Sequence, residues 1–100
     1  MSVSCSVNGN VVNIGVSGRF DFGSHKDFRE AYRNTPSGSD NEYIIDLSST
    51  EYIDSSALGM MLLLREHAGG DQANVTIIGC RKEVKDILVV SNFDKLFKIS

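Results

Sequence analysis

The chain has 100 residues, of which 41% are hydrophobic, so it is long enough for one domain with a single core. Its net charge of -3 excludes the basic surface by which proteins bind nucleic acids or anionic membranes. The first residues, Met1 to Cys5, lack the features of a signal peptide, and the longest apolar run, Met60 to Leu64, is too short to span a bilayer. We therefore expect one soluble, cytoplasmic domain over residues 1–100.

The beginning of the chain predicts a β-hairpin. Apolar residues alternate with serines from Val3 to Val7, which is typical of a half-buried strand. Asn8-Gly9-Asn10 favours a tight turn, because Asn and Gly accept positive φ. The partner strand covers Val11 to Val16, and Ser17-Gly18 ends it.

A loop over Arg19–Gly23 then leads to the first predicted helix. Ser24 is its expected N-cap and Asp27 its capping-box partner, and the helix runs to about Arg33. The residues that this helix is expected to bury are Phe28 and either Ala31 or Tyr32.

The middle of the chain predicts a loop, a strand and a second helix. The loop over Thr35–Asn41 contains the single proline. Tyr43–Leu47 is rich in β-branched and aromatic residues and does not alternate cleanly, which predicts a central strand buried on both faces. Ser48–Glu51 is expected to be a link. The second helix begins at Ser55 and ends near Ala68, before two glycines.

The last third predicts a strand over Val75–Ile78, a turn over Gly79–Arg81 and a helix from Lys82 to about Val90. The residues expected to face inward on this helix are Val84, Ile87, Leu88 and Val90. A short tail strand is expected to contain Phe93, Leu96, Phe97 and Ile99. The order β-β-α-β-α-β-α-β predicts an α/β fold with a mixed, mostly parallel sheet and an N-terminal hairpin.

The second helix has two different faces. At 100° per residue, one face collects small and large apolar residues and must point to the core: Ala57, Met61, Leu64 and Ala68, flanked by Leu58 and Met60. The opposite side collects Ser55, Gly59, Leu62 and Glu66, with Leu63 next to them. Either a neighbouring helix covers the two leucines, or this side is a docking stripe for another protein. Gly59 favours docking, because a missing side chain lets another backbone approach.

Ser55 and Ser56 lie where this helix begins. One interpretation is structural, with Asp54 or Ser55 capping the helix. The alternative is a phosphorylation switch, in which added charge and bulk expel a partner from the docking stripe. Asp21 either orients the hydroxyl or caps its own loop.

Enzyme and metal motifs are missing from the sequence. His67 lies about 18 Å along the helix from Ser55 at 1.5 Å per residue, so it cannot deprotonate that hydroxyl, and His25 is expected to be solvated. Cys5 and Cys80 are in no metal-ligand spacing and are expected to be buried thiols. We therefore expect no catalytic residue, no metal and no cofactor.

Five segments of the chain resemble the STAS-domain anti-sigma factor antagonists, and they occur in the order found in that family. The segments are Gly18–Asp21, Ile44–Leu47, Tyr52–Gly59, Gly69-Gly70 and Ser91–Phe97. Gly18–Gly23 and Ser91–Phe93 are most similar to the HsbA-like branch, which implies a role in biofilm and motility control. The resemblance implies a STAS (SpoIIAA-like) fold over the whole chain.

The resemblance also implies a partner-switching regulator of transcription. In such families a GHKL-type serine kinase, often itself the anti-sigma factor, phosphorylates the serine that follows the aspartate, and a PP2C-type phosphatase removes the phosphate. That serine matches Ser55, with Ser56 as second choice, and Asp21, Asp54 and Ser56 match the supporting positions. Ala57 stands where many members have glycine. The expected partner-binding residues are Gly59, Leu62, Leu63 and Glu66.

Two other functions compete with this interpretation. The first is a non-switching STAS subunit of an ABC transport complex, which would use the same helix stripe to bind the transporter's ATPase. The second is a small hydrolase with a serine nucleophile, against which the missing nearby histidine argues.

Overall fold

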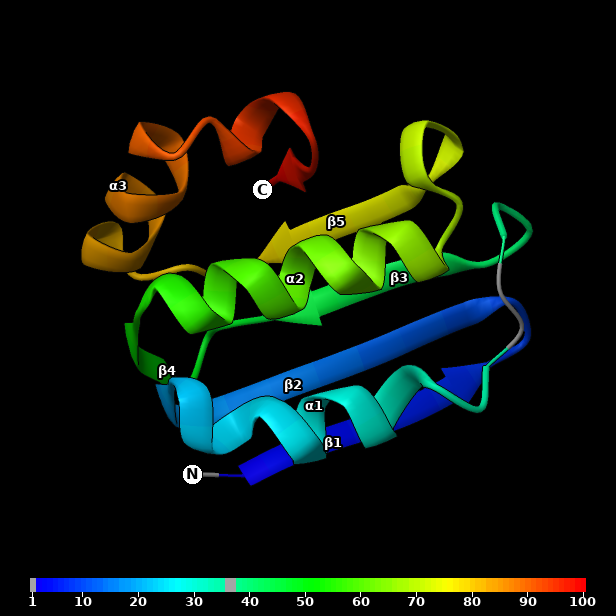
Figure 1. The fold of residues 1–100 in the computed structure, drawn as a ribbon, viewed down its shortest axis with the longest axis horizontal. Coiled ribbons are helices and arrows are strands. Elements are labelled where there is room, and N and C mark those ends of the chain that lie inside the picture. Colours follow the sequence, from blue (N-terminus) through cyan, green and yellow to red (C-terminus); the bar gives the residue numbers. More distant parts are fainter. Residues whose placement is uncertain (1, 36–37) are drawn as a thin grey trace.

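The computed structural model describes residues 2–35 and 38–100, which form one sheet with helices packed on it (Figure 1). The strands are β1 (Ser2–Asn8), β2 (Val11–Phe20), β3 (Glu42–Asp46), β4 (Thr50–Ile53), β5 (Asn74–Ile78) and β6 (Lys98–Ile99). The α-helices are α1 (His25–Tyr32), α2 (Ser55–His67) and α3 (Lys82–Val90). Short 3-10 helices are η1 (Phe22–Ser24), η2 (Gly70–Gln72) and η3 (Phe93–Lys95).

The sheet has the predicted mixed topology. Its strand order is β1-β2-β3-β5-β6, with β4 paired to the end of β2. Only β1 runs antiparallel to its neighbour, because it forms a hairpin with β2, and the other pairs are parallel. The α/β class, the N-terminal hairpin and the mostly parallel sheet are therefore confirmed.

The core lies on one face of the sheet. The paired residues Ile14, Ile45 and Ile77 are fully buried on that face, and α1 and α2 lie across it in Figure 1. The prediction that the central strand is buried on both faces is wrong, since Ile44 and Asp46 of β3 are only half-buried on the other face. Successive right-handed crossovers in one direction place their helices on the same side of a sheet, which leaves the other side uncovered.

The N-terminal strands differ from the prediction in two ways. Cys5 and Val7 are exposed, so Cys5 is not a buried thiol, because β1 is an edge strand. Strand β2 extends into the first two residues of the expected loop and ends at Phe20, because it gains a second partner in β4. The segment Ser48–Glu51 is thus not a simple link, since its last two residues begin β4.

The helix ends also need correction. Ser24 precedes α1, but its side chain makes no cap hydrogen bond to that helix, and Asp27 is not its capping partner. Instead, Ser24 and Asp21 form a capping box around η1. Phe28 and Tyr32 of α1 are buried, and Ala31 is half-buried. The predicted loop over 35–41 includes residues 36 and 37, which lie outside the described residues.

The C-terminal segment buries fewer of its apolar residues than expected. Val84 and Leu88 of α3 are buried, whereas Ile87 is 39% and Val90 83% exposed. The expected tail strand begins with the 3-10 helix η3, Leu96 and Phe97 lie in a turn, and only Lys98–Ile99 pairs with β5. Helix α3 thus has a narrow buried side, formed by Val84 and Leu88.

Candidate functional site

The candidate site is a corner where two strands end and α2 begins. Phe20 of β2 pairs with Ile53 of β4, and the backbone N–H of Asp54 donates to the carbonyl of Phe20 at 3.4 Å. Asp21 and Asp54 each follow one of these paired residues, so both carboxylates come to the same corner. The structure thus brings together residues that lie 33 positions apart in the sequence.

Asp54 is the residue that caps α2. Its Oδ1 accepts a hydrogen bond from the backbone N–H of Ala57 at 3.0 Å. Ser55, at the first helical position, is exposed, and its hydroxyl makes no side-chain hydrogen bond to any of residues 2–35 and 38–100. Ser56 is half-buried. Of the two capping residues considered from the sequence, the structure selects Asp54, which leaves the Ser55 hydroxyl without a structural task.

Asp21 caps its own loop. Its Oδ1 accepts from the backbone N–H of Gly23 at 3.0 Å, and its Oδ2 pairs with the Nε of Arg19 at 3.4 Å. The Arg19 guanidinium also lies 4.2 Å from the centre of the Tyr52 ring, as in a cation–π contact. Of the two roles considered for Asp21 from the sequence, the structure shows the loop cap, whereas the contact between Arg19 and Tyr52 was not predicted.

The predicted division of α2 into two faces is what the structure has. Ala57, Met61, Leu64 and Ala68 are all fully buried. We call the opposite side the α2 surface, and it consists of Ser55, Gly59, Leu62, Leu63 and Glu66, all of which are exposed. Leu62 is 37% and Leu63 56% exposed, so no neighbouring helix covers the two leucines among the described residues. Of the two interpretations of this stripe, the covered one is therefore wrong.

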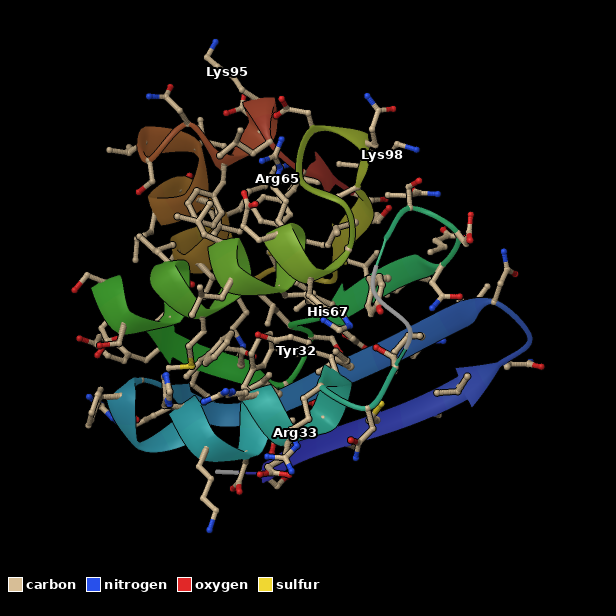
Figure 2. All side chains as sticks on the ribbon, turned by 45° about the vertical axis from the view of Figure 1, so that its right-hand side comes forward. Tyr32, Arg33, Arg65, His67, Lys95 and Lys98 are labelled. Carbon is tan, nitrogen blue, oxygen red and sulfur yellow. The ribbon has the colours of Figure 1, made fainter. Side chains whose placement is uncertain are left out.

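The flanks of the α2 surface have different neighbours. On one flank, Leu63 and Met60 line a groove between α2 and α1. On the other, Arg65 donates from Nε to the carbonyl of Leu96 at 3.2 Å and pairs with Asp71 at 3.4 Å, which ties the C-terminal segment to α2 (Figure 2). The sequence did not predict the groove, because it depends on how two helices pack.

His67 does not reach the corner as a base would need to. His67 is the last residue of α2, at the opposite end from Ser55, and its Nε2 lies 3.0 Å from the carbonyl of Thr35. Figure 2 shows its ring beside Tyr32, at 5.1 Å between ring centres. His25 is exposed and stacks on Phe22. Residues 2–35 and 38–100 contain no group of three metal-binding side chains and no helix able to cross a membrane.

Comparison with known proteins identifies the family. The model of the MlaB-type STAS domain matches residues 3–98, so this chain belongs to the STAS-domain family. A STAS-domain containing protein of Pseudomonas aeruginosa (strain UCBPP-PA14) is 51% identical over 98 residues, which cover 95% of this chain and 93% of that protein.

Two solved structures show the same fold at low identity. An anti-sigma factor antagonist from Mycobacterium paratuberculosis is 18% identical with a TM-score of 0.77, over 98% of this chain and 83% of the other. The anti-sigma factor antagonist SpoIIAA in its unphosphorylated form is 12% identical with a TM-score of 0.72, over 99% of this chain and 87% of the other. The SpoIIAA-like fold that the sequence resemblance implied is therefore confirmed.

Proposed function

We propose that this protein is an anti-sigma factor antagonist that switches partners through phosphorylation of Ser55. The observation that carries the proposal is the exposed hydroxyl of Ser55 at the start of α2, beside the uncovered leucines of the α2 surface. The capping of α2 by Asp54 supports it, because a serine that is not needed as a cap is free to be modified.

In this proposal the unmodified protein binds an anti-sigma factor through the α2 surface. Leu62 and Leu63 supply the apolar contact, Gly59 allows close backbone approach, and Glu66 lies at the far end. The partner is a GHKL-type serine kinase that also sequesters a sigma factor, and a PP2C-type phosphatase reverses the modification. The protein acts in the cytoplasm as a regulator of transcription and has no catalytic activity of its own.

Phosphorylation weakens the contact through charge and bulk. A phosphoserine carries about -1.5 to -2 charges at neutral pH. At Ser55 it joins Asp21 and Asp54 in an already acidic corner, one turn of helix from Gly59. The N-terminus of α2 tolerates the added charge within the molecule. An apolar partner surface does not tolerate it, because the phosphate must be desolvated when the partner packs against α2.

The first experiment maps the modified residue. The protein is incubated with its cognate GHKL-type kinase and ATP, and intact mass and peptide mass spectra are recorded. We expect a single phosphate on Ser55, no labelling of Ser55→Ala, and labelling of Ser56→Ala. Labelling of Ser55→Ala to the level of the unmodified sequence would show that the site is assigned wrongly.

The second experiment tests the consequence of the charge. Binding to the same kinase is measured by calorimetry for Ser55→Asp and for Ser91→Asp, a matched change at an exposed serine after α3. We expect Ser55→Asp to weaken binding at least about tenfold, which corresponds to about 1.4 kcal/mol. Ser91→Asp should bind like the parent. Undiminished binding by Ser55→Asp would contradict the switching mechanism.

A further inference from the structure

The groove between α1 and α2 has a volume of about 370 Å³ and is open to solvent on one side. Its buried lining comes from both helices: Phe28 and Tyr32 of α1, and Met60 of α2, are between 1% and 7% exposed. Leu63 of α2 forms a wall and is 56% exposed. Cavities of about 300–1,000 Å³ with an apolar lining are typical of small-molecule sites.

Apart from the Tyr32 phenol, the polar residues that line the groove are two arginines and two histidines. They are His25, Arg29, Arg33 and His67. Among residues 2–35 and 38–100, no acidic residue lines the groove, although the chain as a whole carries a net charge of -3. The groove is thus a local exception to the charge of the molecule. Electrostatic attraction there favours an anion and disfavours a cation.

Arg29 is the cation available to a ligand. Its guanidinium makes no hydrogen bond or ion pair with any other residue in the described ranges 2–35 and 38–100. Arg33 pairs with Glu30 at 3.1 Å, but both side chains are about half exposed, and such pairs contribute at most about 1 kcal/mol. A ligand anion can therefore recruit Arg33 from Glu30, whereas Arg29 needs no release.

His67 is held in the wall of the groove by contacts with Thr35. The Nε2 of His67 is held by Thr35, at 3.1 Å from its hydroxyl and 3.0 Å from its carbonyl. Figure 2 shows Tyr32 and His67 between the two helices and Arg33 near the end of α1. Burial raises the pKa of the Tyr32 phenol, and the nearby Arg29 guanidinium opposes that rise. The Arg29 guanidinium therefore lies close enough to this side of the groove to act on a group there electrostatically.

We propose that this groove binds a small organic anion with a compact apolar body, such as an aryl or acyl carboxylate. The carboxylate pairs with Arg29 and Arg33 at the rim, and the apolar body packs on Phe28, Met60 and Leu63. Burying that body is favourable by about 25 cal/mol per Å², and the charge-assisted hydrogen bonds fix the orientation of the ligand. The site does not depend on Ser55 or on the proposed switching function.

Binding is tested by amide chemical shifts and calorimetry with two probes, decanoate and naphthalene-2-carboxylate, which separate a linear from an aromatic body. We expect saturable shifts in α1 and α2 for at least one probe. Decyltrimethylammonium, which has the same linear body and the opposite charge, should not saturate. Equal binding of that cation, or no saturable binding of either carboxylate, would overturn the proposal.

Variants separate the roles of charge and surface. The double change Arg29→Gln and Arg33→Gln should lower the affinity for the carboxylate probe at least about tenfold. Leu63→Ser should lower this affinity as well. Arg81→Gln is the matched control, since Arg81 is exposed and lies before α3, outside the groove. All variants change exposed residues, so folding is expected to persist and is checked by circular dichroism. An equal loss in Arg81→Gln would show that the probe responds only to net charge.

Discussion

At the scale of single residues, two buried hydroxyls hold in place the corner where β2 and β4 end. Thr50 donates to the carbonyl of Val16 at 2.6 Å, and Ser24 donates to the carbonyl of Arg19 at 3.2 Å. Both side chains are fully buried, and both bind the backbone of β2 close to where it ends. A buried hydroxyl that has a hydrogen-bond partner stabilises the folded state. A buried carbonyl left without a partner destabilises it by about 1–3 kcal/mol. These two contacts therefore fix how β2, β4 and η1 meet.

The two cysteines give a prediction on pH. Loss of water contact raises the pKa of the Cys5 thiol, and burial raises the pKa of Cys80, where Asp46 adds to the rise and Lys85 opposes it. Because the thiolate is the reactive form, both should react with iodoacetamide more slowly at pH 8 than in the urea-unfolded chain. Cys5→Ser isolates Cys80, the less exposed of the two.

The two thiol shifts also contribute to how stability depends on pH. The folded-state pKa of each thiol lies above the unfolded value near 9.0, so its contribution to the unfolding free energy is fully present below that value. The contribution is lost as pH rises through the folded-state pKa. Faster labelling of the folded protein than of the unfolded chain at pH 8 would contradict the direction of the shifts.

At the scale of elements, the sequence predicted a helix or strand well where its buried residues recur at the regular spacing of that element. The faces of α2 were predicted correctly, because Ala57, Met61 and Leu64 repeat at helical spacing. Strand β4 was missed, because its short sequence Thr50–Ile53 includes an exposed glutamate and tyrosine and pairs with only the end of β2. The exposure of Ile87 was missed as well, because it depends on how little of the rest of the chain packs against α3, which the pattern of the helix itself does not show.

The candidate site shows the same limit. Asp54, Ser55 and the α2 surface are local features of one segment, so the sequence revealed them. The capping of Gly23 by Asp21 is local as well, and it was one of the two roles considered from the sequence. The stacking of Arg19 on Tyr52 and the groove depend on contacts between segments far apart in the chain. No local pattern carries that information.

Gly59 gives a prediction for α2. A Cβ added there would meet nothing within 4 Å, and its φ is not positive. Gly59→Ala should therefore raise the unfolding free energy by about 0.5–1 kcal/mol in urea denaturation, since alanine is the better helix former. If the α2 surface binds a partner closely, the same stabilised variant should bind that partner more weakly.

Gly79→Ala is the matched control for that change. Gly79 has φ 74°, and a Cβ there would lie 2.8 Å from the Cβ of Ser48. We expect Gly79→Ala to lower the unfolding free energy by at least about 1 kcal/mol. A stability gain at both glycines would mean that alanine acts through the unfolded chain alone and that local contacts do not matter.

At the scale of the whole molecule, the fold separates its two sheet faces. All the buried side chains of β3 and β5 lie under the helices, and the other face carries half-buried residues such as Ile44, Thr76 and Ile78. The corner, the α2 surface and the groove all lie on the helical side (Figure 1). A partner and a small ligand would therefore approach the same side of the molecule, with Leu63 common to both surfaces.

The position of β1 has a consequence for solubility. It is an outermost strand of the sheet. Natural edge strands usually avoid pairing with other chains by carrying proline or charged residues, and Ser2–Asn8 contains neither. We expect the protein to associate with itself at high concentration, as measured by sedimentation velocity. Ser6→Lys should keep it monomeric, while Ser91→Lys, which adds the same charge away from β1, should not. Equal behaviour of the two variants would mean that net charge, and not an open strand edge, limits how concentrated this protein can be.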